Sequence, residues 1–275
     1  MDSPLKWHGG KHYLAPKLWE IAKTVPHVHR VEVFGGSLAF TLASEPEGYS
    51  EVVNDIDQCL TCFWDVLQSE FAFHEFIRVA QATPFSEGQY RRARVLLEQW
   101  RIGRPVVSHR LAHAFFVACR QSLAGRMATF APITRRRTRR GMNEQASAWL
   151  SAVEGLPAIH ERLKRVVILD GQHFTKVLQS QDGEQTLFYC DPPYLPSTRA
   201  SVGEYAHEMT EAEHVGLLAG LAALRGKFLL SGYRNDLYDG IANANGWQRR
   251  DFELPNNAAA GKAKRRMVEC VWTNF

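Results

Sequence analysis

Residues 188–194 read Phe188-Tyr189-Cys190-Asp191-Pro192-Pro193-Tyr194, an apolar stretch that ends in two prolines between an acid and an aromatic ring. A proline has no backbone N–H and fixes φ near about −65°, so this pair cannot continue a sheet ladder. The stretch therefore predicts a buried β-strand that stops at Asp191. In an open α/β sheet, ligands bind at the carboxyl ends of the strands.

The tetrapeptide Asp191–Tyr194 suits a flat heterocycle that carries an exocyclic amine. The carboxylate of Asp191 and a carbonyl held by the prolines can accept the two amine hydrogens, and the ring of Tyr194 can stack on the base. A strand followed by a proline turn with a capping aspartate is the simpler structural interpretation. The tetrapeptide alone leaves both open.

A glycine turn precedes this strand in the chain. Residues 31–37 read Val31-Glu32-Val33-Phe34-Gly35-Gly36-Ser37, a predicted strand that runs into two glycines, and residues 38–43 have a helical pattern. A second predicted strand, residues 51–53, ends at Asn54-Asp55, about 20 residues past the glycines. An acid at that distance commonly binds ribose hydroxyls. Together these segments predict a nucleotide-binding α/β unit.

The rest of the chain alternates strands and helices around one long interruption. Further strands are predicted at residues 166–169, 187–190, 228–233 and 267–272, and helices at 14–25, 56–68 and from the capping box Thr210-Glu211-Ala212-Glu213. Residues 70–165 have no strand pattern and read as several helices interrupted by an arginine-rich loop. We therefore predict an α/β fold with helices on both faces of its sheet and a mostly helical insertion.

Composition excludes several protein classes. The chain has 45% hydrophobic and 23% charged residues, as soluble globular proteins do, and no apolar run as long as a membrane span. The first residues lack the hydrophobic region of a signal peptide. The five cysteines are scattered, and the pair Cys59 and Cys62 lies in an apolar helical pattern without a second pair, so we expect core packing and no metal site. These features predict a cytoplasmic protein without structural disulfides.

Positive charge is concentrated in one segment. Residues 101–145 contain ten arginines, no lysine and one acid, Glu144, which gives +9 against +4 for the whole chain. A basic region on an otherwise acidic protein indicates a polyanionic partner. The run Thr134-Arg135-Arg136-Arg137-Thr138-Arg139-Arg140-Gly141 is too charged for a core. It is either a solvated loop or, because the arginine fork matches phosphates and guanine edges, a nucleic-acid contact.

The ordered motifs resemble the N6-adenine DNA methyltransferases of the Dam (D12) type, particularly the orphan enzymes of phages and prophages. The similarity spans nearly the whole chain and rests first on residues 4–11, 31–37, 54–57 and 191–194. Residues 120–126, 141–145 and 254–259 resemble the phage subgroup in particular. Whether a restriction–modification partner exists is left open.

The resemblance implies a Rossmann-like fold dependent on S-adenosylmethionine (SAM) and a specific reaction. Residues 1–69 and 161–275 would form the SAM-binding catalytic domain, and residues 70–160 the DNA target-recognition insertion. The implied activity is transfer of the SAM methyl group to the exocyclic N6 of a flipped adenine in double-stranded DNA, without a metal. Catalysis would lie with Asp191, Pro192, Pro193 and Tyr194, and the implied SAM contacts are Trp7, Lys11, Glu32, Phe34, Gly36, Asp55 and Asp191.

The DNA contacts implied by the resemblance lie mainly in the insertion. Arg120, Gln121 and Arg126 are candidates for reading bases or for filling the gap that a flipped adenine leaves. Phosphate contacts are expected from Arg135, Arg136, Arg137, Arg139 and Arg140, and from the basic loop residues Lys262, Lys264 and Arg265. Double-stranded DNA is the expected partner; neither a membrane nor an obligate protein partner is indicated.

Three positions depart from the usual pattern of that family. Val33 and Leu38 stand where a proline and a further glycine are usual, and Gln172 stands where an acid follows the third strand, unless Asp170 takes that role. Cytosine-N4 methylation is the nearest alternative, although that tetrapeptide more often begins with serine. Methylation of RNA or of a protein amide is a further alternative. A non-catalytic DNA-binding protein with a degenerate methyltransferase fold is another, and the simultaneous presence of Lys11, Asp55 and Asp191 argues against it.

Overall fold

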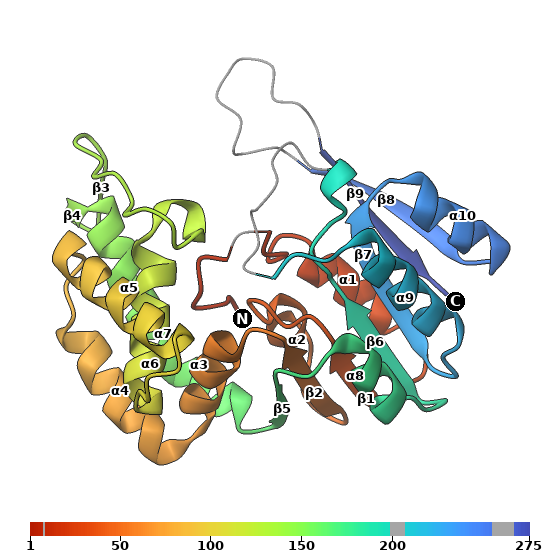
Figure 1. Ribbon diagram of the computed structural model, residues 1–275, viewed down its shortest axis with the longest axis horizontal. Helices are drawn as coiled ribbons and strands as arrows, with labels where there is room; N and C mark the ends of the chain where they lie inside the picture. Colours follow the sequence, from red (N-terminus) through yellow and green to blue (C-terminus); the bar gives the residue numbers. More distant parts are fainter. Residues whose placement is uncertain (8, 199–206, 255–266) are drawn as a thin grey trace.

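Seven strands form one mixed sheet with the order β5-β2-β1-β6-β7-β9-β8 in the computed structural model, which describes residues 1–7, 9–198, 207–254 and 267–275 (Figure 1). The first five strands in this order are parallel, whereas β9 is antiparallel to both β7 and β8. The strands are β1 (His29–Glu32), β2 (Ser50–Asp55), β5 (Val166–Asp170), β6 (Thr186–Cys190), β7 (Lys227–Tyr233), β8 (Gln248–Leu254) and β9 (Met267–Thr273).

The chain reverses direction across the sheet between β1 and β6. From β1 it proceeds outward through β2 to β5, and it then returns to β6 on the other side of β1. Every residue of β6 is buried, as expected for a central strand covered on both faces. Such a reversal point opens a crevice at the carboxyl ends of the two adjacent strands. The strand ends at Glu32 and Cys190 therefore mark the expected ligand site.

Helices cover both faces of the sheet, as predicted. Phe188 and Leu230 pack in one core with residues of α8, α9 and α10, whereas Leu187, Tyr189 and Leu229 pack with α1 and α2 on the other face. The predicted capping box of α9 is present, with Thr210 and Glu213 each bonded to the other's backbone N–H. These helices are α1 (Ala15–Ala22), α2 (Ala39–Ala43), α8 (Phe174–Gln181), α9 (Glu211–Ala222) and α10 (Asp236–Ala244).

The predicted insertion is mostly helical and forms a lobe beside the sheet (Figure 1). It comprises α4 (Glu70–Ala82), α5 (Glu87–Arg101), α6 (Ser108–Gln121), the short 3-10 helix η1 (Leu123–Gly125), the hairpin strands β3 (Thr138–Arg139) and β4 (Met142–Asn143), and α7 (Glu144–Leu163). The core of this lobe is built around α3 (Gln58–Gln68), where Phe63 stacks on Phe116 of α6 with ring centroids 5.7 Å apart. Val53 and Val166 of the sheet belong to the same core.

A buried ion network joins the lobe to the sheet. Glu51 on β2 accepts a hydrogen bond from Arg30 on β1 at 2.8 Å and one from Arg162 near the end of α7 at 2.7 Å. All three side chains are buried. Removing one member of such a group leaves uncompensated charge in the interior, at a cost of about 3–5 kcal/mol. The network thus fixes α7 against the strands that carry the ligand crevice.

Some elements differ from the sequence prediction. The strand predicted at 31–34 ends at Glu32, and the helix predicted at 56–68 begins at Gln58 because the Asp57 carboxylate accepts the Cys59 N–H at 2.9 Å. Strand β8 was not predicted, since residues 248–254 are mainly polar and its position at the sheet edge leaves much of it exposed. All five cysteines are free, as expected. In the described part of the chain, no helix is long and apolar enough to cross a membrane.

Candidate active site

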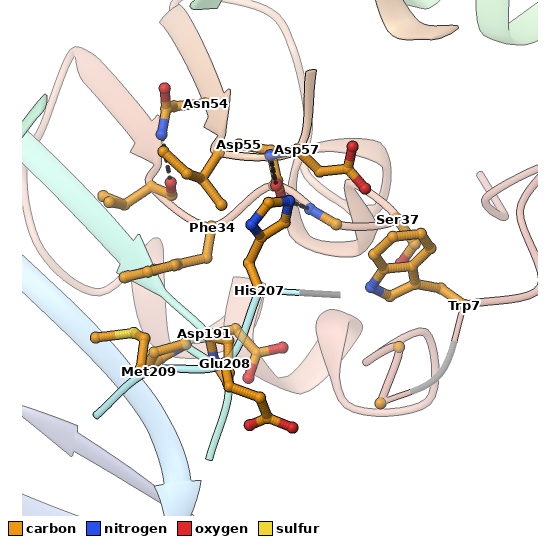
Figure 2. A pocket seen from close by; sticks show the side chains of 18 of the residues that line it. Trp7, Phe34, Ser37, Asn54, Asp55, Asp57, Asp191, His207, Glu208 and Met209 are labelled. Atoms are coloured by element: carbon orange, nitrogen blue, oxygen red, sulfur yellow. Dashed lines mark hydrogen bonds between the residues drawn. The ribbon is translucent and has the colours of Figure 1, made fainter. Parts of the chain in front are cut away.

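A cavity of about 700 Å³ opens at the carboxyl ends of β1, β2 and β6, where the strand order reverses. Its wall is formed by the segment around Trp7, the glycine turn after β1, the end of β2 and the tetrapeptide after β6. The helical lobe contributes Arg94, Leu97 and Arg101 of α5 and the loop 125–128. Figure 2 shows the side chains of Trp7, Asp55 and Asp191 around this space. The cavity has the size of a typical small-molecule site.

The glycine turn is fixed by the acid at the end of β2. The Gly36 N–H donates to Asp55 Oδ2 at 2.8 Å, and the Asp57 N–H donates to Asp55 Oδ1 at 2.9 Å. Gly36 has a φ of 48°, and a Cβ placed there would approach Trp7 Nε1 to 2.8 Å. Only glycine fits this conformation and this contact. Three of the predicted SAM contacts, Trp7, Gly36 and Asp55, are therefore held together.

Burial raises the pKa of the two wall acids that lie at the ends of β1 and β2. Burial raises the pKa of Asp55 to about 6, although the N–H groups of Asp57 and Gly36 lower it. Burial also raises the pKa of Glu32 to about 8, against the hydrogen bonds that Glu32 Oε2 accepts from Thr41 N at 2.9 Å and Thr41 Oγ1 at 2.6 Å. Glu32 is thus largely protonated near neutral pH. The site combines buried hydrogen-bonding acids with the aromatic ring of Phe34.

Asp191 directs part of its carboxylate toward the cavity. Its Oδ1 accepts a hydrogen bond from the Tyr194 hydroxyl at 3.2 Å and lies 3.4 Å from the Lys11 ammonium. Among the described residues no donor reaches Oδ2, and the Asp191 side chain is 19% exposed. Pro192 and Pro193 also line the cavity. One carboxylate oxygen is therefore available to a ligand.

Tyr194 lies behind this carboxylate, and Lys11 lies beside it in the cavity wall. The Tyr194 ring is buried, contacts Tyr233 edge-on with ring centroids 4.6 Å apart, and does not line the cavity. The Lys11 ammonium lies 4.6 Å from the centre of the Tyr194 ring. Burial lowers the pKa of Lys11, but Asp191 and Glu269 together hold it well above its ordinary value. Glu269 of β9 was not among the predicted site residues; a single acid in an apolar strand gave no signal of its role.

One predicted DNA contact, Gln121, is an internal side chain instead. Gln121 is fully buried, donates to the Pro84 carbonyl at 3.0 Å and accepts from the Ser86 N–H at 3.0 Å. Its burial in the last turn of α6 contradicts the prediction that it contacts DNA in this conformation. Arg120 is half-buried and donates to the Ala148 carbonyl at 2.7 Å, so its contact with DNA stays a prediction. Arg126, in contrast, is exposed and lines the cavity.

Only part of the arginine run forms a hairpin, from β3 to β4, and Arg135, Arg136 and Arg137 lie in the irregular segment that leads into it. Arg140 and Gly141 connect β3 to β4 with positive φ values of 55° and 72°. The Arg140 guanidinium donates to both carboxylate oxygens of Glu154 at 2.9 Å, which ties the hairpin to α7. Arg135, Arg136 and Arg139 are exposed and form no ion pair with the described residues. The predicted contacts Lys262, Lys264 and Arg265 lie outside the described residues.

The departures from the family pattern can be located in the structure. Gln172 lines the cavity, whereas Asp170 accepts a hydrogen bond from Thr61 of α3 and is not part of the wall. Asp170 therefore does not replace the missing acid. Leu38 has a φ of 53°, in the region that favours glycine, and its side chain is buried in the core of the lobe. Burial of the leucine offsets a backbone strain of about 1–2 kcal/mol.

Gly125 provides a test of the cavity wall. It has a φ of 74°, and a Cβ there would overlap the Lys6 carbonyl, next to Trp7. We expect Gly125→Ala to reduce the free energy of unfolding by about 2–3 kcal/mol and Tm by about 5 °C or more, measured by thermal unfolding. Gly155→Ala is the control, because this exposed glycine inside α7 has open space around it and alanine favours a helix. Equal stability of the two variants would contradict this role of Gly125.

Comparison with known proteins agrees with the geometry. A search of curated proteins finds no significant match. Among the described residues, no group of three or more acidic, histidine or cysteine side chains is placed to hold a metal ion. The sequence profile of the D12 class N6 adenine-specific DNA methyltransferases matches residues 7–251, which include every part of the cavity described above. The chain therefore belongs to the D12 class of N6 adenine-specific DNA methyltransferases, enzymes that transfer the methyl group of SAM to adenine N6 in DNA.

Proposed function

We propose that this enzyme binds SAM and a flipped adenine in the cavity between Asp55 and Asp191. The observation that carries this proposal is the convergence of residues 7, 9–11, 32–37, 55 and 191–193 on that cavity. These segments come from both ends of the chain, and the reversal of strand order brings them together. We also infer from the motifs at 120–126 and 141–145 that the enzyme is an orphan of the phage and prophage subgroup.

The cavity fits SAM in its donor set and its shape. Asp55, at the end of β2, would accept the ribose hydroxyls, since each of its oxygens accepts one backbone N–H and keeps a free lone pair. Glu32, Phe34 and Gly36 would surround the methionine portion, and Trp7 would lie against the opposite side. Lys11 would act less directly, because its buried ammonium already contacts two carboxylates.

Asp191 would supply the main polar contact to the adenine amine. The amine is a weak nucleophile because its lone pair is conjugated with the ring. Acceptance of its two hydrogens by Asp191 Oδ2 and a proline-held carbonyl favours the pyramidal geometry in which the lone pair is free. SAM supplies, when bound, a methyl group on a positively charged sulfur. The amine proton can pass to water after transfer, so Asp191 acts by positioning and charge.

The adenine must leave the duplex to reach this cavity, which costs a few kcal/mol. Stacking on Tyr194 would offset part of that cost, but the ring is buried behind Asp191. Such stacking therefore requires the ring to turn toward the cavity when the base enters. Arg126 is exposed and lines the cavity, so it is the proposed contact to the base pair from which the adenine has been flipped.

The helical lobe would recognise DNA. Residues 70–160 would form the target-recognition region, and residues 1–69 and 161–275 the catalytic domain. Two observations support this division: α5 and the loop 125–128 form one wall of the cavity, and Arg135, Arg136 and Arg139 are exposed in the arginine run of the same lobe. Sequencing of modified bases in DNA from cells that express the enzyme would identify the methylated sites. Absence of N6-methyladenine in such DNA would contradict the proposed function.

Replacing Asp55 by asparagine should mainly weaken SAM binding. The amide retains the size of the side chain but loses the charge that strengthens hydrogen bonds to ribose, so we expect Kd to rise about 10-fold to 100-fold. Isothermal titration calorimetry with SAM measures this change. Asp236→Asn is a matched control, because Asp236 is exposed in the first turn of α10. Unchanged SAM affinity of the Asp55 variant would exclude ribose binding by this residue. No SAM affinity of the unaltered protein would favour the degenerate DNA-binding alternative.

A further inference from the structure

Four side chains form a cluster that extends from the cavity wall into the interior, which we call the carboxylate cluster: Lys11, Asp191, Tyr194 and Glu269. The Lys11 ammonium lies 3.4 Å from Asp191 Oδ1 and 3.3 Å from Glu269 Oε1, and it donates to the Gly9 carbonyl at 2.9 Å. An ammonium has three hydrogens, and three acceptors surround this one. Lys11 is therefore shared equally between the two carboxylates.

The Tyr194 hydroxyl is shared in the same way. It lies within hydrogen-bond distance of Asp191 Oδ1, at 3.2 Å, and it also contacts Glu269 Oε1. A hydroxyl has one hydrogen and can donate it to only one of these oxygens at a time. Asp191 and Glu269 consequently compete for two donors, the ammonium of Lys11 and the hydroxyl of Tyr194.

Glu269 takes part only through these donors. It lies on β9 opposite Tyr233 of β7, is 2% exposed, and does not line the cavity. An adenine in the cavity would thus touch Asp191 but not Glu269. The ionisable groups that surround Glu269 in the described part of the chain are Lys11, Tyr13, Tyr189, Asp191, Tyr194 and Tyr233.

The charges of the cluster are not balanced. Two carboxylates face one ammonium, and Glu32, the next acid along the wall, also adds negative charge near Asp191 when it ionises. Burial raises the pKa of Glu269 to about 7 although Lys11 lowers it. Burial likewise raises the pKa of Asp191, against the effect of Lys11. Because like charges disfavour each other's ionisation, a charged Glu269 makes Asp191 harder to ionise.

We propose that Glu269 is a positioning residue for methyl transfer, which shares Lys11 and Tyr194 with Asp191 and thereby sets the charge that Asp191 presents to the adenine amine. This inference rests on the proposed role of Asp191 as acceptor of the amine hydrogens. Loss of the Glu269 charge leaves the Lys11 ammonium to Asp191 alone. Because the pKa of Glu269 is about 7, this loss occurs as pH falls through neutrality.

The test is the pH dependence of methyl transfer in single turnover, with SAM and DNA saturating, for the full-length Glu269→Gln enzyme. Transfer requires ionised Asp191, so the rate falls as pH decreases through the pKa of that group. Because the pKa of Glu269 is about 7, its charge appears near neutral pH and should produce a further change in rate there, which we expect Glu269→Gln to abolish. Glu184→Gln, the same change at an exposed loop position, should keep this change in rate. Glu269→Asp, which retains a carboxylate, should keep it as well.

Tyr194→Phe tests the carboxylate cluster by removing the shared donor hydroxyl. It also replaces the first test if Glu269→Gln does not fold. It removes a hydroxyl that stabilises both negative charges and keeps the ring, so the acidic limb should move to higher pH. A rate profile that is unchanged in both variants, or in Tyr194→Phe alone if only that variant folds, would overturn the inference. Full activity of Asp191→Asn would exclude the proposed function itself. If Asp191→Asn is inactive and the other profiles are unchanged, only the role of Glu269 is excluded.

Discussion

Asp191→Asn is expected to lower the single-turnover rate of methyl transfer by at least about 100-fold while SAM still binds. Removal of one fixed hydrogen-bonding group at the reacting atoms commonly costs about 10²–10³ in rate. The asparagine has nearly the same volume, so the packing of the tetrapeptide should persist. It presents a neutral amide to the adenine amine, and the charge that favours the reactive amine geometry is lost. Measurement requires DNA that carries the methylated site and labelled SAM.

Asp170→Asn is the matched control for this variant. Both aspartates lie at the carboxyl end of a parallel strand: Asp170 is the last residue of β5, and Asp191 directly follows β6. Asp170, however, accepts a hydrogen bond from Thr61 and does not line the cavity. Its rate of transfer should remain close to that of the unaltered enzyme. Turnover by Asp191→Asn at the rate of this control would exclude the proposed mechanism. Loss of both activity and SAM binding would instead assign Asp191 mainly to the cofactor.

Neutralising three exposed arginines of the arginine run is expected to have the largest effect on DNA affinity. Arg135, Arg136 and Arg139 are exposed, whereas Arg140 is paired with Glu154, so the triple change to glutamine removes only available charge. Each phosphate contact contributes a slope of about 0.9 in log K against log salt. Between 0.1 and 1 M salt three such contacts amount to a factor of up to about 500. Equilibrium binding at several salt concentrations gives both the affinity and the slope.

The control is a second triple variant, which loses the same amount of charge at the amino ends of the parallel strands. Lys23, Arg165 and Arg225 precede β1, β5 and β7 at their amino ends, away from the cavity, and changing them to glutamine should preserve the salt slope. If the arginine variant has the same salt slope and DNA affinity as this control, the arginine run is only a solvated surface and does not contact DNA. A variant that instead relaxes the choice of one base pair, at about 1–3 kcal/mol, would indicate that one arginine reads a base edge.

The sequence predicted the sheet and the cavity well because both depend on local signals. Two consecutive prolines end β6 wherever the rest of the chain lies, and the glycines before α2 permit a conformation that other residues disfavour. Parallel strands then bring their carboxyl ends to one edge. Asp55 and Asp191 therefore line the same cavity although the whole insertion separates them in the chain.

The errors have a common physical origin. Gln121 belongs to a polar stretch that suggests a surface, but its position on α6 faces the lobe interior, where the Pro84 carbonyl and the Ser86 N–H satisfy it. Glu269 is the acidic residue of an otherwise apolar strand, and the sequence pattern suggests an exposed side chain at its position. Only the packing of β9 against β7 places it beside Lys11. Long-range partners of buried polar groups are not encoded in spacing along the chain.

If the helical lobe recognises DNA, as proposed, the shared core around α3 decides how recognition can be exchanged between related enzymes. Phe63 of α3 packs on the lobe while Val53 and Val166 of the sheet close the same core, and Arg162 of α7 is paired with Glu51. A chimera joined at residues 70 and 160 would place foreign helices on a native α3 and separate Arg162 from its own helix. Junctions near residues 56 and 165 would move the helices and their packing surface as one unit. New sequence preferences should therefore be transplanted together with α3 and the end of α7.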